Sequence, residues 1–205
     1  MQISRRSLLT AGTAILAIGP AAAQGTDPRM AERAIGLADA PVTVREFFSL
    51  TCSHCAAFHR DTMPRVHKEL IDTGRLRMIF HDFPLDQLAL TAAAVARSLP
   101  ADRYEPFVAA LLASQDRWAF ARGVNATEEL WKTAALAGLP RATFDAAVSD
   151  QALKTAILAA QDKDSKTYKI ESTPSFVFGG LNAKNRMESG AKPYDEFARL
   201  VAAAA

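Results

Sequence analysis

The sequence predicts an α/β protein in which a long helical block interrupts a small domain with a central mixed sheet. Three observations support this fold class. A β-branched and aromatic run at 42–48 is followed by a helical pattern and by a second such run at 76–80. The stretch 85–158 is rich in alanine and keeps a helical spacing of its apolar residues. The strand pattern returns only after this block, at 172–180.

The composition is that of an ordinary globular protein. The 205 residues are 49% hydrophobic and 22% charged, which excludes a wholly disordered or collagen-like chain. Removing Arg5 and Arg6 with the first 23 residues leaves 22 basic and 22 acidic residues. The chain therefore lacks the basic excess of nucleic-acid binders, and we expect no nucleic-acid partner. Two cysteines are also too few for a disulfide-rich scaffold.

Residues 1–23 have the pattern of a signal peptide. Arg5 and Arg6 precede an apolar run at 8–18, which a Gly-Pro pair and three alanines follow. The run has about half the length of a membrane-spanning helix, so an uncleaved anchor is the less favoured alternative. The Ser-Arg-Arg-Ser-Leu-Leu segment resembles a bacterial twin-arginine signal, which we favour over a general secretory signal. Either route predicts export to the periplasm, where disulfides persist.

The first part of the expected sheet lies directly after the signal. Residues 24–40 form a short leader with an edge strand near 34–36. The first long strand follows, and then a helical pattern over 55–71. Pro64 lies inside this pattern, where we expect a kink. A Thr-Gly pair ends the helix before the second strand, at 76–80.

The helical block and the second part of the sheet follow. Breakers at Pro100, Gly123 and 138–140 divide the block into several helices. After it we expect, in order, a helix at about 150–168, a strand at 172–180, a return strand at 185–188 and a closing helix at 193–203. The expected domains are therefore the α/β domain, at 41–84 and 159–205, and the inserted helical domain, at 85–158.

The two cysteines lie directly after the first long strand, at the start of a helix. In the segment Cys52-Ser53-His54-Cys55, two intervening residues let the sulfurs approach bonding distance within one turn. Cys52 would sit at the helix N-terminus, where unpaired N–H groups and the helix dipole lower the pKa of its thiol. The thiolate is the nucleophile in disulfide exchange. Cys55 would be the more buried, resolving thiol, and His54 could add positive charge or a hydrogen bond beside the Cys52 sulfur.

Three other uses of the cysteines are less consistent with the sequence. A structural disulfide across so short a loop would restrain the unfolded chain by only about 2 kcal/mol. A metal site could use Cys52, Cys55, His59 and the adjacent His54, but structural zinc sites normally need a second pair of ligands. Inert free thiols are uncommon in an oxidising compartment. We therefore expect a redox-active cysteine pair with no metal and no separate cofactor.

The segment from Glu46 to Cys55 resembles the active-site segment of the DsbA-like thiol:disulfide oxidoreductases. Members of that family carry a similar acid-aromatic-aromatic-Ser lead-in and a CxHC centre. Thr173-Pro174, followed by Phe176, resembles the family's cis-proline loop. The resemblance covers nearly all of 35–203. It implies a thioredoxin fold with an inserted helical domain, in agreement with the order of elements expected above.

The resemblance also implies roles for individual residues. Thr173 and Pro174 would lie against the cysteines and present backbone to a substrate strand, with Ser53 beside them as a further substrate-binding residue. Ser53 stands where the best-known members have proline, and the reduction potential in the family depends on that dipeptide. Glu46 would lie beneath the cysteines and move protons, the alternative being a solvent-facing strand position. The remaining histidines are expected to be surface or hydrogen-bonded polar residues: His59, His67 and His81.

Together these features predict a periplasmic thiol:disulfide oxidoreductase that introduces disulfides into exported proteins with free cysteines. Cys52 would form a mixed disulfide with a substrate cysteine. The resemblance implies that a membrane oxidase of the DsbB type restores the Cys52–Cys55 disulfide. The alternatives are a disulfide isomerase or reductase on the same fold, a copper chaperone, and a relative acting on glutathione conjugates. The short leader at 24–40 leaves no room for a dimerisation domain, so we expect a monomer.

Overall fold

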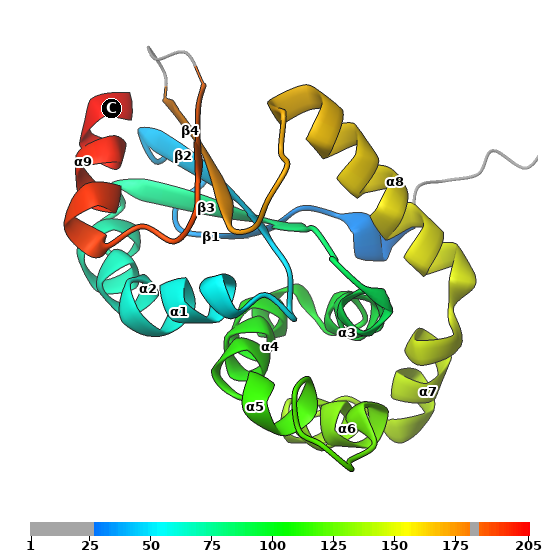
Figure 1. The fold of residues 1–205 in the computed structure, drawn as a ribbon. Helices are drawn as coiled ribbons and strands as arrows, with labels where there is room; N and C mark the ends of the chain where they lie inside the picture. Colours follow the sequence, from blue (N-terminus) through cyan, green and yellow to red (C-terminus); the bar gives the residue numbers. More distant parts are fainter. Residues whose placement is uncertain (1–26, 181–184) are drawn as a thin grey trace, which may run out of the picture.

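The computed structural model describes residues 27–180 and 185–205. The expected signal peptide at 1–23 lies outside the described residues. A central sheet carries α1, α2 and α9 at one side (Figure 1). The helices α3 to α7 gather at one end of the molecule, and α8 leads back from them to β4.

The sheet has five strands among the described residues, and helices fill the connections from β2 to β3 and from β3 to β4. The strands are β1 (Arg33–Ile35), β2 (Val42–Phe48), β3 (Leu76–Asp82), β4 (Ser175–Gly180) and β5 (Arg186–Ser189). The helices are α1 (Ser53–Asp61), α2 (Met63–Val66), α3 (Gln87–Arg97), α4 (Ala101–Ala113), α5 (Gln115–Trp118), α6 (Ala126–Leu136), α7 (Arg141–Ser149), α8 (Gln151–Tyr168) and α9 (Tyr194–Ala204). A 3₁₀ turn, η1 (Pro28–Met30), and a π-helical turn, η2 (His67–Ile71), complete the set.

The strand order is β1-β3-β2-β4-β5, and the sheet is mixed, as predicted. β2 and β3 are parallel, with Glu46 opposite Phe80. The other pairs, β1 with β3, β2 with β4 and β4 with β5, are antiparallel. A parallel neighbour requires a crossover, and α1, α2 and η2 supply it. The cysteines begin this crossover, at the carboxyl end of β2.

The alternating side chains of β2 explain which helices cover it. Val42, Val44 and Phe48 belong to the main hydrophobic core, together with residues of α1 and α9. Phe47 points to the opposite face and packs in a smaller cluster with Val177. A period of two places successive strand residues on opposite faces, so one face of β2 is buried along its whole length, whereas the other is buried at Phe47 and half-buried at Thr43 and Arg45.

The helix expected at 55–71 is divided into α1, α2 and η2 rather than kinked at one point. Thr62 separates α1 from α2, and its hydroxyl donates to the Lys192 carbonyl at 2.8 Å. Pro64 lies in the first turn of α2, where its missing N–H has no intrahelical partner to lose. The break therefore precedes the proline.

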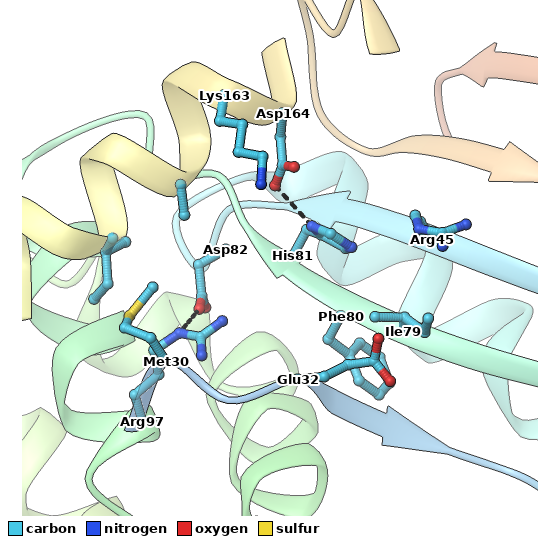
Figure 2. A pocket seen from close by; sticks show the side chains of 12 residues that line it. Met30, Glu32, Arg45, Ile79, Phe80, His81, Asp82, Arg97, Lys163 and Asp164 are labelled. Atoms are coloured by element: carbon cyan, nitrogen blue, oxygen red, sulfur yellow. Dashed lines mark hydrogen bonds and ion pairs between the residues drawn. The ribbon is translucent and has the colours of Figure 1, made fainter. Parts of the chain in front are cut away.

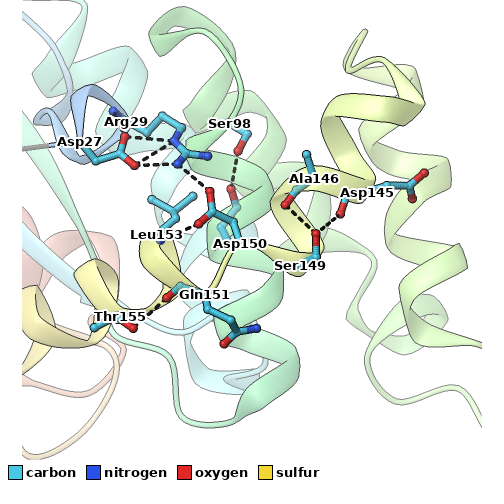
Figure 3. Close-up of polar contacts among 11 residues, drawn as sticks. Asp27, Arg29, Ser98, Asp145, Ala146, Ser149, Asp150, Gln151, Leu153 and Thr155 are labelled. Atoms are coloured by element: carbon cyan, nitrogen blue, oxygen red, sulfur yellow. Dashed lines mark hydrogen bonds and ion pairs between the residues drawn. The ribbon is translucent and has the colours of Figure 1, made fainter.

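The expected boundary between 158 and 159 falls inside α8, which runs unbroken across it. The helix begins where Asp150 accepts a hydrogen bond from the Leu153 N–H at 2.9 Å (Figure 3). Arg29 joins this cap to the leader, because its guanidinium pairs with both Asp27, at 2.6 Å, and Asp150, at 2.7 Å. The N-terminal residues of the described chain are thus fastened to the end of the helical insertion.

A buried polar cluster connects the leader, the sheet and the insertion. Arg97 of α3 pairs with Asp82 at the end of β3, and the Tyr104 hydroxyl of α4 donates to the same carboxylate at 2.8 Å. Arg33 of β1 donates to the Arg97 carbonyl at 3.1 Å. Buried charges are tolerated when they are paired and hydrogen-bonded, and here they fix how α3 and α4 meet the sheet.

Candidate active site

Cys52 lies at the N-cap of α1, with extended backbone angles of φ −85° and ψ 116°. Its own N–H donates to the Ser49 carbonyl at 3.1 Å, which closes the turn between β2 and the helix. Its sulfur accepts a hydrogen bond from the Cys55 N–H at 3.3 Å. An N-cap side chain in this position receives the free N–H groups of the first turn, which favour negative charge.

This environment lowers the pKa of Cys52 to about 5. The largest cause is a hydrogen bond from the Cys55 thiol, and partial burial acts against it. The Thr173 side chain and the backbone N–H groups of Cys55 and His54 add further hydrogen bonds to the ionised sulfur. Cys52 is therefore a thiolate at neutral pH, while its residue keeps 7% of its surface exposed.

Cys55 lies one turn into α1 and has the opposite character. The residue is 0% exposed, and burial strongly raises the pKa of its thiol, with a further rise from the neighbouring Cys52 sulfur. Both cysteines are free thiols in this structure. One sulfur is thus prepared to attack or to leave as an anion, and the other holds its proton.

The loop before β4 lies across from the Cys52 sulfur. In its protonated form the Cys52 thiol donates to the Thr173 carbonyl at 3.3 Å, and the Thr173–Pro174 peptide bond is cis. The Thr173 hydroxyl is buried and has no hydrogen-bond partner within the described ranges. It is therefore free to donate to the sulfur when Cys52 ionises.

Glu46 lies on the buried face of β2, which makes the solvent-facing alternative wrong. The residue is 0% exposed, and His59 Nε2 lies 2.9 Å and 3.2 Å from its two carboxylate oxygens. Burial opposes charge on His59, but the charge of Glu46 and its hydrogen bond raise the pKa of the imidazole overall. The charge of Glu46 is also one of the causes that raise the pKa of Cys55, as expected of an acid beneath the cysteines.

His54 and Ser53 occupy the exposed first turn of α1. Over the part of the chain that the structure describes, no hydrogen bond joins the His54 ring to the Cys52 sulfur; only the backbone N–H of His54 acts on it. Of the two roles expected for the ring, the hydrogen bond is therefore absent from the described chain. Ser53 lies beside the sulfur at the surface, where a bound chain could reach it.

Two residues near the cysteines were not expected in the site. His59 is a buried, hydrogen-bonded polar residue, one of the two settings expected for it, but its place beside Glu46 was not predicted. Its position four residues after Cys55 was the signal, since i and i+4 share a helix face. Gln115 is the second, and it reaches the cysteine loop from the helical insertion with hydrogen bonds to the carbonyls of Leu50 and Cys52. No local pattern marks Gln115, because 63 residues separate it from Cys52.

A cavity of about 250 Å³ lies elsewhere, between β3, α8 and the leader (Figure 2). None of the expected site residues lines it. Its acids are already paired: Asp82 with Arg97, Glu32 with Arg77 at 2.6 Å, and Asp164 with the His81 ring at 2.7 Å. These ion pairs and hydrogen bonds join the elements around the cavity.

Within 27–180 and 185–205, no three His, Cys, Asp or Glu side chains are grouped so that they could hold a metal ion. In the same ranges, no helix has both the length and the apolar character needed to cross a membrane.

Comparison with known sequences gives matches over most of the chain. A family model described as Thioredoxin matches residues 29–202. Disulfide bond formation protein D of Bacillus subtilis (strain 168) is 28% identical over 181 residues, which are 82% of this chain and 74% of that protein. A relative from Rickettsia prowazekii (strain Madrid E), whose name places it among the protein-disulfide oxidoreductases, is 29% identical over 145 residues. The match takes in 70% of this chain and 53% of the relative, so the chain spans about half the length of that protein.

Solved structures agree with these matches. The crystal structure of Wolbachia pipientis alpha-DsbA1 has a TM-score of 0.78 and 27% identity, over 85% of this chain and 91% of that chain. BdbD from Bacillus subtilis, in its oxidised form, has a TM-score of 0.70 at 20% identity, a likeness of fold alone. The predicted thioredoxin fold with a helical insertion is confirmed. The chain belongs to the thioredoxin family, among its DsbA-like members.

Proposed function

We propose that this protein is a thiol:disulfide oxidoreductase that works as a dithiol oxidase on exported proteins, with Cys52 and Cys55 as its redox centre. The observation that carries the proposal is the contrast between the two thiols: the pKa of Cys52 is lowered to about 5, whereas burial raises that of Cys55. The names of the relatives support the class of reaction. The residues at 1–23 support action in the periplasm, since they have the pattern of an export signal.

The reaction begins with the Cys52–Cys55 disulfide. A substrate thiolate attacks the Cys52 sulfur, a substrate–Cys52 bond forms, and the Cys52–Cys55 bond breaks, with Cys55 taking up a proton. The second substrate thiolate then attacks the substrate sulfur of this mixed disulfide, and Cys52 leaves as a thiolate. Two electrons pass from the substrate to the protein, so the substrate gains a disulfide and the protein becomes a dithiol.

The low pKa of Cys52 sets the direction of the reaction. A sulfur that is stable as an anion is a good leaving group, so the mixed disulfide resolves rapidly towards the oxidised substrate. The same stabilisation favours the reduced protein over its disulfide form, which makes that disulfide oxidising. A membrane oxidase of the DsbB type would then remove the two electrons and restore the disulfide.

Reoxidation requires the buried Cys55 thiol to lose its proton. Glu46 is the acid whose charge acts on Cys55, and His59 holds that acid by a hydrogen bond of 2.9 Å. We assign Glu46 to accept the proton of Cys55, with His59 balancing the charge in the interior. The substrate backbone would lie against Thr173 and Pro174, beside the Cys52 sulfur and Ser53. The protein would act as a monomer.

The test uses the full chain, oxidised, and a peptide with two cysteines. We expect loss of the peptide thiols with one peptide disulfide formed per Cys52–Cys55 disulfide consumed. Cys52→Ser should abolish this, and Cys55→Ser, once Cys52 carries a mixed disulfide with a peptide that has a single cysteine, should retain the bound peptide because no second thiol is present to release it. Peptide oxidation by Cys52→Ser would remove Cys52 from its role.

Four further measurements test the alternatives. Efficient refolding of a scrambled disulfide protein without peptide oxidation would indicate an isomerase, and rapid insulin reduction a reductase. Tight stoichiometric metal in the reduced protein, without disulfide exchange, would indicate a metal chaperone. A dimer in solution would contradict the monomer.

A further inference from the structure

Gln115 is a buried polar residue of the helical insertion that contacts the cysteine loop. It begins α5 and is 6% exposed. Its side-chain amide donates to the Leu50 carbonyl at 2.8 Å and to the Cys52 carbonyl at 3.0 Å. Within the described chain its hydrogen bonds go to backbone carbonyls and to neither sulfur, so it holds the backbone that carries the reactive sulfur.

The two carbonyls lie on either side of the turn that leads into α1. Gln115 supplies the donor that reaches the Leu50 carbonyl within the described part of the chain. The Cys52 carbonyl also accepts the first bond of the helix, from the Ala56 N–H at 3.1 Å. One amide group, with its two N–H donors, thus joins the turn before the helix to the helix itself.

The α4–α5 segment keeps Gln115 in a fixed place. The Ser114 hydroxyl donates to the Ala110 carbonyl at 2.7 Å, which closes the turn between the two helices. Trp118 is fully buried and donates its indole N–H to the Leu111 carbonyl at 2.8 Å. The backbone N–H groups of Ala119 and Phe120 both donate to the Gln115 carbonyl at 2.9 Å. The amide therefore projects from a well-packed corner of the insertion.

We propose that Gln115 is a positioning residue of the redox centre, through which the helical insertion holds Cys52 at the angle that directs the Cys55 N–H at its sulfur. This inference rests on the proposed function. The bond it protects, from the Cys55 N–H to the Cys52 sulfur, is 3.3 Å long, and its strength depends on the orientation of the Cys52 backbone. Without the amide, the Leu50 carbonyl loses its donor and the turn can rotate. The thiolate of Cys52 then loses part of its stabilisation.

The experiment compares Gln115→Met with the wild-type protein. Methionine has nearly the same length and volume but donates no hydrogen bond. We expect the pKa of Cys52 in the reduced protein, followed by thiolate absorbance, to rise by about one unit. At neutral pH the equilibrium constant for oxidising glutathione should fall by about tenfold, because one pKa unit is a factor of ten.

Gln161→Met is the matched control. Gln161 lies in α8, and its amide donates to the Pro84 carbonyl at 3.3 Å, so this variant also removes a bond from a glutamine to the backbone. It should leave the pKa of Cys52 and the glutathione equilibrium unchanged. Circular dichroism and urea unfolding of both variants measure the effect of each substitution on folding and stability, separately from its effect on the pKa of Cys52.

The outcomes distinguish the possible roles. If Gln115→Met lowers stability but keeps the wild-type pKa of Cys52, Gln115 is structural only and the proposal is wrong. If Gln115→Met fails to fold, NMR of the reduced wild-type protein tests the proposal instead. The side-chain amide resonances of Gln115 should shift with pH, with the same midpoint as the ionisation of Cys52. Resonances that do not shift would overturn the proposal. A wild-type protein that oxidises no peptide would contradict the proposed function, while the pKa comparison would still judge Gln115.

Discussion

Ionisation of Cys52 should make the stability of the reduced protein depend on pH. The folded pKa of about 5 lies below the value of about 8.5 for a free thiol, so the folded state binds fewer protons than the unfolded state between these values. The thiolate therefore contributes stability that is complete above the unfolded pKa. That contribution is lost as the pH falls through about 5.

The size of the effect follows from the same two values. Between about pH 4.5 and about pH 7, linkage gives a change of about 2.5 kcal/mol in the free energy of unfolding. The sulfur lies near the surface, where solvent screens its interactions, which reduces the expected change to about 2 kcal/mol. Domains of this kind have total stabilities of about 5–15 kcal/mol, so the change is well within measurement.

The assay is urea unfolding of the reduced wild-type protein and of Cys52→Ser, in excess reductant, across this pH range. Serine does not titrate there, and the pair formed by Glu46 and His59 is common to both proteins, so its own pH dependence cancels. The difference in the free energy of unfolding between the wild-type protein and Cys52→Ser should increase in favour of the wild type by about 2 kcal/mol from the lower to the higher pH. A difference that stays constant with pH would refute the claim that Cys52 is ionised in the reduced protein at neutral pH. It would also remove the reason for expecting the cysteine pair to act as an oxidant.

Three substitutions test other contacts of the structure. Thr173→Val removes the hydroxyl beside the sulfur and should raise the pKa of Cys52 by about half a unit in a thiolate titration; no change would mean that the hydroxyl does not reach the anion. His59→Leu leaves the Glu46 carboxylate buried without its partner and should destabilise the protein by about 3 kcal/mol in urea unfolding. A double variant that removes both the His59 imidazole and the Glu46 carboxylate should recover much of that loss. A double variant no more stable than His59→Leu would contradict the pairing. Tyr104→Phe should lower stability by about 1–3 kcal/mol, because the Asp82 carboxylate loses a buried donor; wild-type stability would show that the hydroxyl contributes nothing.

Most of the fold was predictable because local patterns determine it. The strand at 42–48 is uninterrupted by breakers, and β2 has the predicted bounds. β3 extends two residues further than expected, through His81 and Asp82. Polar side chains are less common in a buried strand, so the strand was expected to end before them. In the structure His81 pairs with Asp164 and Asp82 pairs with Arg97, both on elements distant in the sequence. Such pairing depends on the tertiary structure and leaves no mark on the local sequence.

The residues of the site also fall into those marked by the local sequence and those placed by tertiary contacts. The spacing of the cysteines and the helix start after a strand indicated both Cys52 and Cys55, since these features are local. The burial of Glu46 could be weighed from its apolar neighbours but not decided. Whether the exposed His54 ring bonds to the sulfur depends on which rotamer the surface allows, and the contact of Gln115 depends on how the insertion folds back. These two follow only from the assembled structure.

The two outermost strands are the shortest of the sheet: β1 has three residues and β5 has four. Long, flat strand borders offer unpaired backbone groups on which other chains can assemble and aggregate. A protein that takes unfolded polypeptides as substrates meets such chains continually. Under the proposed function, two short borders would confine backbone pairing with a substrate chain to the loop beside the reactive sulfur, and so favour release of the substrate after exchange over its accumulation on the sheet.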